Sequence, residues 1–194
     1  SHFAPVLERP SPEDPAFLFV GRYVEEKGVD VLVKAYRRYR QSVSEPWPLI
    51  TAGAGPFETM LASTEGVENR GFVQPEELPK LMEKAAAFVL PSRFEPWGVV
   101  VQEAAAAGLP VLCSTASGAG VHLVRDGYYG FQVESGSVEH LAETMRRMSA
   151  LSEKQRRQMG DRGHHLSKQY TPERWAETFV EGVKRYTRQV STSQ

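Results

Sequence analysis

The sequence predicts an α/β fold: a doubly wound parallel sheet with helices on both faces, in the Rossmann-like arrangement. Three observations favour this class. Short apolar runs recur along the chain, amphipathic stretches separate them, and glycine or proline ends most of the runs. A continuous apolar run indicates a strand buried on both faces, and alternation of such strands with helices is typical of a parallel sheet.

Five apolar runs are expected to form strands: residues 16–20, 49–52, 72–73, 87–90 and 111–113. Helices are expected over residues 30–42, near 78–82, over 99–107, after the capping residue Ser137, and from about 153 to about 167. Thr171-Pro172-Glu173 signals one more helix, because it joins a capping hydroxyl, a proline at the first helical position and an acid in the first turn. The apolar stripe of that helix comprises Trp175, Phe179, Val183 and Tyr186.

The 194-residue chain is expected to divide into three parts. Residues 1–15 contain several prolines and no periodic pattern, which is typical of a linker. Residues 16–168 are expected to form the folded domain, and residues 169–190 the final helix. A domain that opens on a linker suggests a chain cut from a longer protein.

Composition argues against several functional classes. The net charge of -1 gives no strong field for nucleic acid or an acidic membrane surface. No apolar run reaches transmembrane length, and the N-terminus lacks a signal-peptide pattern. The single cysteine, Cys113, excludes an internal disulfide and is interpreted as a small buried hydrophobe.

Polar residues that follow the apolar runs carry the most functional information, because ligands of open parallel sheets bind beyond the carboxyl ends of the strands. Arg22 and Lys27 follow the first run, on a turn bounded by Gly21 and Gly28. Two cations there suit a diphosphate, because arginine can donate to two phosphate oxygens at once and lysine supplies a compact positive charge. The alternative is an ordinary solvated loop.

The segment from Pro91 to Glu103 is the most unusual. A strand ends, Glu95 follows in a loop, and Glu103 lies further along the next helix. The free N–H groups of that helix N-terminus favour phosphate. Carboxylates on either side suit sugar hydroxyls, those of a hexose at Glu95 and those of a ribose at Glu103. The alternative is a helix N-terminal acid and a surface acid.

These residues resemble the C-terminal domain of retaining GT-B-fold glycosyltransferases, the group 1 (family 4) class. Seven short motifs stand in the family's order over most of residues 16–150, and the resemblance extends to the final helix. They are Gly21-Arg22 with Lys27-Gly28, Gly53-Ala54-Gly55-Pro56, Gly71-Phe72-Val73, Pro91-Ser92, Glu95 with Glu103 as an E-x7-E pair, Ala106-Ala107-Gly108-Leu109-Pro110-Val111, and Asp126-Gly127 with Gly130.

The resemblance implies the donor-binding half of an enzyme that moves a hexose from a UDP-, GDP- or ADP-sugar to an acceptor hydroxyl with retention. Arg22 and Lys27 would neutralise the diphosphate, and Glu95 would hold the sugar hydroxyls; these three are the candidate catalytic residues. Glu103 would hold the ribose, and the loop at Gly71-Phe72-Val73 would meet the base. The candidate donor-binding residues are Gly21, Gly71, Phe72, Val73, Trp97, Gly98, Val99 and Glu103. Neither a metal nor a cofactor is expected.

The expected partners are the nucleotide sugar, an acceptor glycan or lipid-linked acceptor, and an N-terminal acceptor domain that this chain lacks. The fragment alone is expected to bind donor without transferring it. The expected location is the cytoplasm, with a peripheral position at the inner face of a membrane as an alternative. The basic pairs Arg37-Arg38, Arg146-Arg147 and Arg156-Arg157 are interpreted as solvated helix faces.

Two segments depart from the family pattern. Many relatives have Gly-Phe-Gly after the first glutamate, where this chain has Pro96-Trp97-Gly98, so one backbone donor is missing. Ser117-Gly118-Ala119-Gly120 lacks the glutamate that relatives often carry, and it receives no role. His164 and His165 are expected to be exposed on different helix faces.

Other functional classes stay open on the sequence alone. A non-hydrolysing sugar-nucleotide epimerase or a phosphorylase would use the same scaffold, although no lysine context for pyridoxal phosphate is apparent. A non-catalytic flavodoxin-like or receiver-like module is the third reading, although a receiver would carry paired acids where Gly21-Arg22 stands. Gly53-x-Gly55 and Gly118-x-Gly120 do not complete a dinucleotide fingerprint, and no Walker A pattern exists.

Overall fold

The computed structural model describes residues 12, 14–169 and 180. Its strands form one sheet in the order β3-β2-β1-β4-β5-β6, and every neighbouring pair is parallel. The strands are β1 (Phe17–Val20), β2 (Leu49–Ala52), β3 (Val67–Asn69), β4 (Ala87–Leu90), β5 (Val111–Ser114) and β6 (Gly130–Val133). This is the strand order of a doubly wound Rossmann-type sheet, so the predicted fold class is confirmed.

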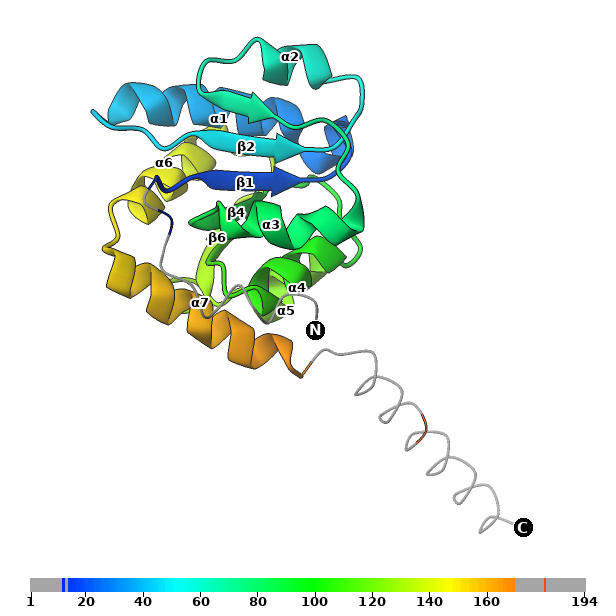
Figure 1. Ribbon diagram of the computed structural model, residues 1–194, viewed down its shortest axis with the longest axis vertical. Helices are drawn as coiled ribbons and strands as arrows, with labels where there is room; N and C mark the ends of the chain where they lie inside the picture. Colours follow the sequence, from blue (N-terminus) through cyan, green and yellow to red (C-terminus); the bar gives the residue numbers. More distant parts are fainter. Residues whose placement is uncertain (1–11, 13, 170–179, 181–194) are drawn as a thin grey trace.

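Helices lie on both faces of the sheet (Figure 1). On one face, α1 (Val29–Ser42) packs against α6 (Val138–Ser149). On the other, α4 (Val99–Ala106) packs against α5 (Gly118–Leu123) and α7 (Glu153–Ser167). The shorter helices are η2 (Glu25–Lys27), α2 (Glu58–Ala62), η3 (Pro75–Glu77) and α3 (Leu78–Glu83).

The four inner strands form the centre of the core. Every residue of β2, β4 and β5 is buried, and only Val20 in β1 is partly exposed. Phe17 at the start of β1 packs against the rings of Tyr39 and Trp47, with centroids 5.4 and 5.1 Å away. Burial on both faces explains why these strands are continuous apolar runs in the sequence.

The two edge strands differ from the prediction. The sequence predicts the third strand at residues 72–73, but the strand is Val67–Asn69 and residues 72–73 lie in the loop that follows it. The last strand, Gly130–Val133, has no counterpart in the prediction. An edge strand needs no continuous apolar run: β3 has the exposed Glu68 at its centre, and β6 has the partly exposed Gln132.

Local capping agrees with the predicted helix starts. The Ser137 hydroxyl accepts a hydrogen bond from the His140 N–H and begins α6. Ser152 and Gln155 form a reciprocal capping box at the start of α7. None of the helices in the described part of the chain is long and apolar enough to cross a membrane. Most of the predicted linker, and the final helix with its apolar stripe, lie outside the described residues.

Candidate functional site

The candidate site lies where the strand order reverses. β1 pairs with β2 on one side and with β4 on the other, so the loops that leave β1 and β4 diverge from neighbouring carboxyl ends. Such a switch point is the usual ligand site of an open parallel sheet. The loop after β1 carries Arg22 and Lys27, and the loop after β4 carries Glu95, so the fold brings the predicted residues to one edge.

Gly28 fixes the turn that carries Lys27. Its φ of 67° is left-handed, and it both ends η2 and begins α1. A Cβ at this position would lie 2.2 Å from the carbonyl oxygen of Pro91, so the turn packs directly on the backbone that leaves β4. Only glycine satisfies both the backbone angle and this close approach.

Lys27 and Glu95 form an ion pair, although 68 positions separate them in the sequence. Lys27 Nζ donates to Glu95 Oε2. The two side chains are only 19% and 11% exposed, so water screens the pair much less than an ordinary surface pair. Two of the three predicted catalytic residues are therefore in direct contact.

A second ion pair joins the loop after β4 to the first turn of α1. Both terminal guanidinium nitrogens of Arg93 donate to the carboxylate of Asp30, one of them at 2.8 Å. The Arg93 backbone N–H also donates to the Glu26 carbonyl oxygen at 2.8 Å. The hydrogen bonds from Arg93 hold the pKa of the Asp30 carboxyl below its usual range. The sequence analysis gives neither residue a role, although Arg93 lies in the segment from Pro91 to Glu103 and Asp30 begins a predicted helix.

The turn after β5 supports the Glu95 loop from its other side. Glu95 and Ser117 form an isolated parallel bridge, in which the Glu95 N–H donates to the Ala116 carbonyl and the Gly118 N–H donates back to the Glu95 carbonyl. A Cβ on Gly118 would lie 2.3 Å from the carbonyl oxygen of Pro96. The segment left without a role by the sequence therefore positions the backbone of a candidate site residue.

Backbone turns also connect the ends of β1, β2 and β3. The Gly53 N–H donates to the Gly71 carbonyl oxygen at 2.7 Å, and a Cβ on Gly53 would lie 1.9 Å from the carbonyl oxygen of Gly21. The Asn69 side-chain oxygen accepts from the Tyr23 hydroxyl and the Gly71 N–H, both at 2.9 Å. Asn69 is a further supporting residue that the sequence analysis missed.

The remaining predicted residues have contrasting surroundings. Arg22 is exposed, and it has no ion-pair partner among the residues that the structure describes. Gly98, with a φ of 90°, is the N-cap of α4, and Val99 opens the helix. Glu103, one turn further along α4, is half-buried, and this burial raises the pKa of its carboxyl group. Glu103 is therefore not the ordinary surface acid of the alternative reading.

Large exposed apolar side chains gather on the loops of this edge. Phe72, Phe94 and Val99 have exposed fractions of 70%, 67% and 61%, and each belongs to a loop or helix start that follows a strand. Trp97 is only half-buried, and its ring lies beside that of His122 at a centroid distance of 5.8 Å. The predicted residues Phe72, Trp97 and Val99 are thus accessible to a ligand.

Three residues outside the site test smaller predictions. Cys113 is fully buried, and desolvation raises the pKa of its thiol to about 12, in keeping with a small core hydrophobe. His165 is exposed as predicted, but His164 is half-buried and its Nδ1 lies 2.7 Å from the carbonyl oxygen of Ala106, so the prediction for His164 is wrong. Across the described ranges, no cluster of three histidine, cysteine or acidic residues could hold a metal ion.

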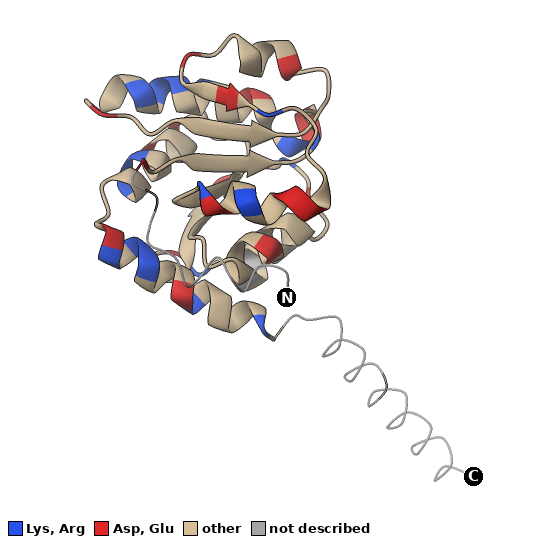
Figure 2. Ribbon diagram, in the orientation of Figure 1, with Lys and Arg blue, Asp and Glu red and all other residues tan. Residues whose placement is uncertain are grey.

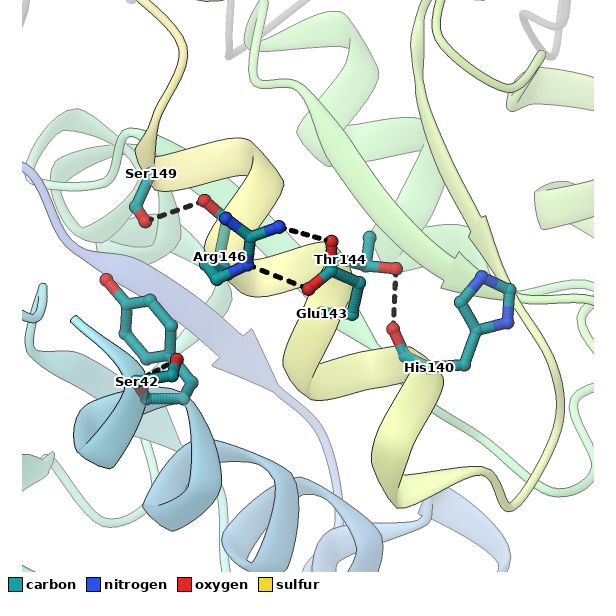
Figure 3. Close-up of polar contacts among 7 residues, drawn as sticks. Ser42, His140, Glu143, Thr144, Arg146 and Ser149 are labelled. Atoms are coloured by element: carbon teal, nitrogen blue, oxygen red, sulfur yellow. Dashed lines mark hydrogen bonds and ion pairs between the residues drawn. The ribbon is translucent and has the colours of Figure 1, made fainter.

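The basic pairs on the helices are interspersed with acids (Figure 2). Arg146 binds Glu143 through two nitrogens at 2.8 and 2.6 Å on the outer face of α6 (Figure 3). The hydroxyls of the buried Thr144 and of Ser149 donate to carbonyl oxygens of the same helix. Arg38 of α1 pairs with Glu139 of α6, so this exposed pair joins two helices. Arg37, Arg38, Arg146, Arg147 and Arg157 are exposed, as the sequence analysis expects. The expectation is wrong for Arg156, which is half-buried with its guanidinium 4.9 Å from the centre of the Trp47 ring, and burial lowers its pKa.

The comparisons with known proteins decide the family. The family model described as glycosyl transferases group 1 matches residues 7–165. The chain belongs to this family. This glycosyltransferase domain is 30% identical over 178 residues to an uncharacterized glycosyltransferase of Methanocaldococcus jannaschii, an alignment that covers 90% of the domain and 48% of the relative. The chain thus spans about half the length of that curated relative.

Solved structures with the same fold include larger proteins and a domain of similar size. The glycosyltransferase domain superimposes on sucrose-phosphate synthase from Thermosynechococcus elongatus with a TM-score of 0.74 and 25% identity, covering 97% of this chain and 48% of that one. It superimposes on the C-terminal domain of a group 1 glycosyltransferase from Francisella tularensis with a TM-score of 0.71 and 21% identity. In that comparison 84% of this chain matches 89% of the other.

Proposed function

We propose that this glycosyltransferase domain is the donor-binding half of a retaining hexosyltransferase, which takes its hexose from a nucleoside-diphosphate sugar. The observation that carries the proposal is the meeting of Lys27 and Glu95 at the carboxyl edge of the sheet. A cation for the diphosphate and a carboxylate for sugar hydroxyls lie side by side there, as the two halves of such a donor require. The match to a separate C-terminal domain of a family member supports the assignment to that half.

In the proposed mechanism the domain mainly stabilises the leaving group. As the bond between the anomeric carbon and the diphosphate breaks, negative charge grows on the departing oxygens. Arg22 and Lys27 would neutralise that charge, and fixed charges at a partly dry site are effective in this role. Glu95 would orient the hexose and Glu103 the ribose. The exposed loop at residues 71–73 would meet the base.

We propose that the acceptor, a glycan or a lipid-linked molecule, is held by a part of the enzyme outside this chain. Positioning an acceptor hydroxyl against the anomeric carbon contributes several kcal/mol to catalysis, about 7 or more in well-oriented systems. The chain alone should therefore bind donor and transfer nothing. Neither a metal nor a cofactor has a part in this proposal.

The test is a thermal-shift panel of UDP, GDP and ADP, each alone and with a common hexose attached. One nucleotide series should raise the unfolding temperature of the wild-type chain, because a ligand that binds only the folded state stabilises it. Arg22→Ala should reduce this shift, whereas Arg146→Ala, which changes an arginine on α6, should not. The absence of a shift with every nucleotide would contradict the proposal, and so would an equal shift with the bare nucleosides.

A further inference from the structure

The ion pair between Lys27 and Glu95 has a consequence for ligand selection. Within the described residues, each of these side chains is the other's only charged partner. Both are largely buried, so a Glu95 carboxylate that loses Lys27 would be left with little water around it. Removing one member of such a pair leaves the other charge uncompensated, which is costly.

The proposed donor separates this pair. We propose that the pair makes binding of the diphosphate and binding of the hexose depend on each other, so that the site favours an intact nucleotide sugar over the nucleoside diphosphate that remains after transfer. This inference rests on the proposed function, in which the diphosphate contacts Lys27 and the hexose contacts Glu95. It adds a specificity role to both residues.

A bare nucleoside diphosphate satisfies only half of the pair. Its phosphates draw Lys27 away, and Glu95 keeps no cation and gains no hydroxyl. An intact nucleotide sugar gives Lys27 the phosphates and gives Glu95 the hexose hydroxyls, so both charged groups remain partnered. Opening a buried ion pair costs least when each of its two charged groups gains a new partner from the ligand. Only the intact nucleotide sugar supplies a partner to both Lys27 and Glu95.

The loops can keep their positions while the pair opens. Arg93 binds Asp30, the Arg93 N–H bonds the Glu26 carbonyl, and Gly28 packs on the backbone of Pro91. These contacts join the loop after β4 to the turn after β1 and the first turn of α1, and they involve neither Lys27 nor the Glu95 carboxylate. The exchange of partners is therefore confined to two side chains. When the hexose leaves, Lys27 can return to Glu95, which favours release of the nucleoside diphosphate.

The test is Glu95→Gln in the 194-residue chain, studied by titration calorimetry with UDP and UDP-glucose, GDP and GDP-mannose, and ADP and ADP-glucose. The variant frees Lys27 without changing the shape of residue 95. It should bind the bare nucleoside diphosphate more tightly than the wild type, by roughly fivefold, and the nucleotide sugar more weakly. Glu95→Ala should change the two affinities in the same directions, and a thermal melt checks that both variants fold.

The matched control is Glu26→Gln, which removes a negative charge from the same turn. Glu26 is exposed, and its side chain has no ion-pair partner among the described residues. An equal gain in nucleoside-diphosphate affinity with this variant would overturn the inference, because the local field alone would then explain the gain. If the wild type binds nucleotide, an unchanged or lower affinity of both Glu95 variants for the nucleoside diphosphate would also overturn the inference. If neither the wild type nor the Glu95 variants bind any nucleotide, the proposed function fails and the inference fails with it.

Discussion

The carboxyl edge of the sheet and the outer faces of α6 and α7 both carry ion pairs. The pairs at the edge join segments that are distant in the sequence, whereas those within α6 and within α7 join turns of one helix. At the edge, Arg93 and Asp30 are 63 positions apart, and their pair joins the loop after β4 to the first turn of α1. On α6 and α7, Arg146–Glu143 and Arg157–Glu153 join neighbouring turns of one helix and are exposed. A pair within a helix adds little to a structure that forms without it. The Arg93–Asp30 pair fixes the position of a loop relative to a helix that is distant in the sequence.

Glycines show the same contrast between the two regions. Gly28 and Gly136 have similar left-handed φ angles of 67° and 76°. Gly28 packs against the Pro91 backbone, whereas a Cβ on Gly136 would meet nothing within 4 Å. Glycine is therefore required at position 28 by both the backbone angle and the close packing, and at position 136 by the backbone angle alone.

The largest effect is expected for Gly28→Ala. The new methyl group would collide with the Pro91 carbonyl in addition to straining the backbone, so the free energy of unfolding should fall by about 3 kcal/mol. Gly136→Ala is the control and should lose only the strain, about 1 kcal/mol. Urea unfolding of the two variants measures the difference. Equal losses would show that the loops do not pack as tightly as described.

A smaller effect, on ligand affinity rather than stability, is expected for Arg22→Ala. Arg22 is exposed and contacts no acid in the described chain, so its removal should leave the free energy of unfolding unchanged. If Arg22 binds the diphosphate, nucleoside-diphosphate affinity should fall about tenfold or more, while affinity for the nucleoside changes little. Calorimetry with both ligands is the measurement. Equal losses for the two ligands would remove Arg22 from the phosphate site.

Asp30→Asn tests the Arg93–Asp30 pair directly. It should lower the free energy of unfolding at neutral pH by about 1 kcal/mol, because Arg93 loses a charged partner. Since pairing holds the pKa of Asp30 below its usual range, this contribution is present above the unfolded-state pKa and is lost as pH falls through the lower folded-state pKa. The stability difference between wild type and variant should therefore shrink below about pH 4. Glu143→Gln on α6 serves as the control and should change stability by less than the error of urea titration.

A small change in stability, of the opposite sign to that of Asp30→Asn, is expected for Glu103→Gln. Burial raises the pKa of Glu103, so its charged form is unfavourable in the free domain. The variant should be more stable than the wild type by about 0.5 kcal/mol at pH 8, and this advantage should vanish near pH 4, where the wild-type carboxyl is protonated. If Glu103 holds the ribose, affinities for nucleoside diphosphate and nucleotide sugar should fall together. Unfolding at the two pH values and calorimetry are the measurements.

The sequence predicted the parts of the fold that are buried on both sides. β1 and β4 are apolar throughout, and β2 and β5 each have a single hydroxyl residue, Thr51 and Ser114, so these runs can be recognised without knowledge of their neighbours. The edge strand β3 and the glycine-led edge strand β6 escaped detection because one side of each is unpaired and its pattern is mixed. Short helices with little apolar surface, such as α2, were also missed.

The candidate site was predictable as a set of residues but not as a set of contacts. The positions of Arg22, Lys27 and Glu95 after buried strands identified the edge of the sheet. Nothing in the spacing indicates that Lys27 touches Glu95, because the contact depends on β4 lying beside β1. The same limit applies to Ser117, whose bridge to Glu95 depends on the turn after β5.

The position of β1 between β2 and β4 affects the order in which the protein can fold during synthesis. β2 follows β1 closely, but β4 begins at Ala87, and until it emerges from the ribosome one side of β1 lacks its partner. Contacts between distant segments must await the whole intervening chain and carry a larger loop-closure cost. The loop with Glu95 emerges later still, directly after β4. The nascent chain therefore cannot assemble the Lys27–Glu95 pair until its central sheet can close, and nucleotide binding on the ribosome would report that closure.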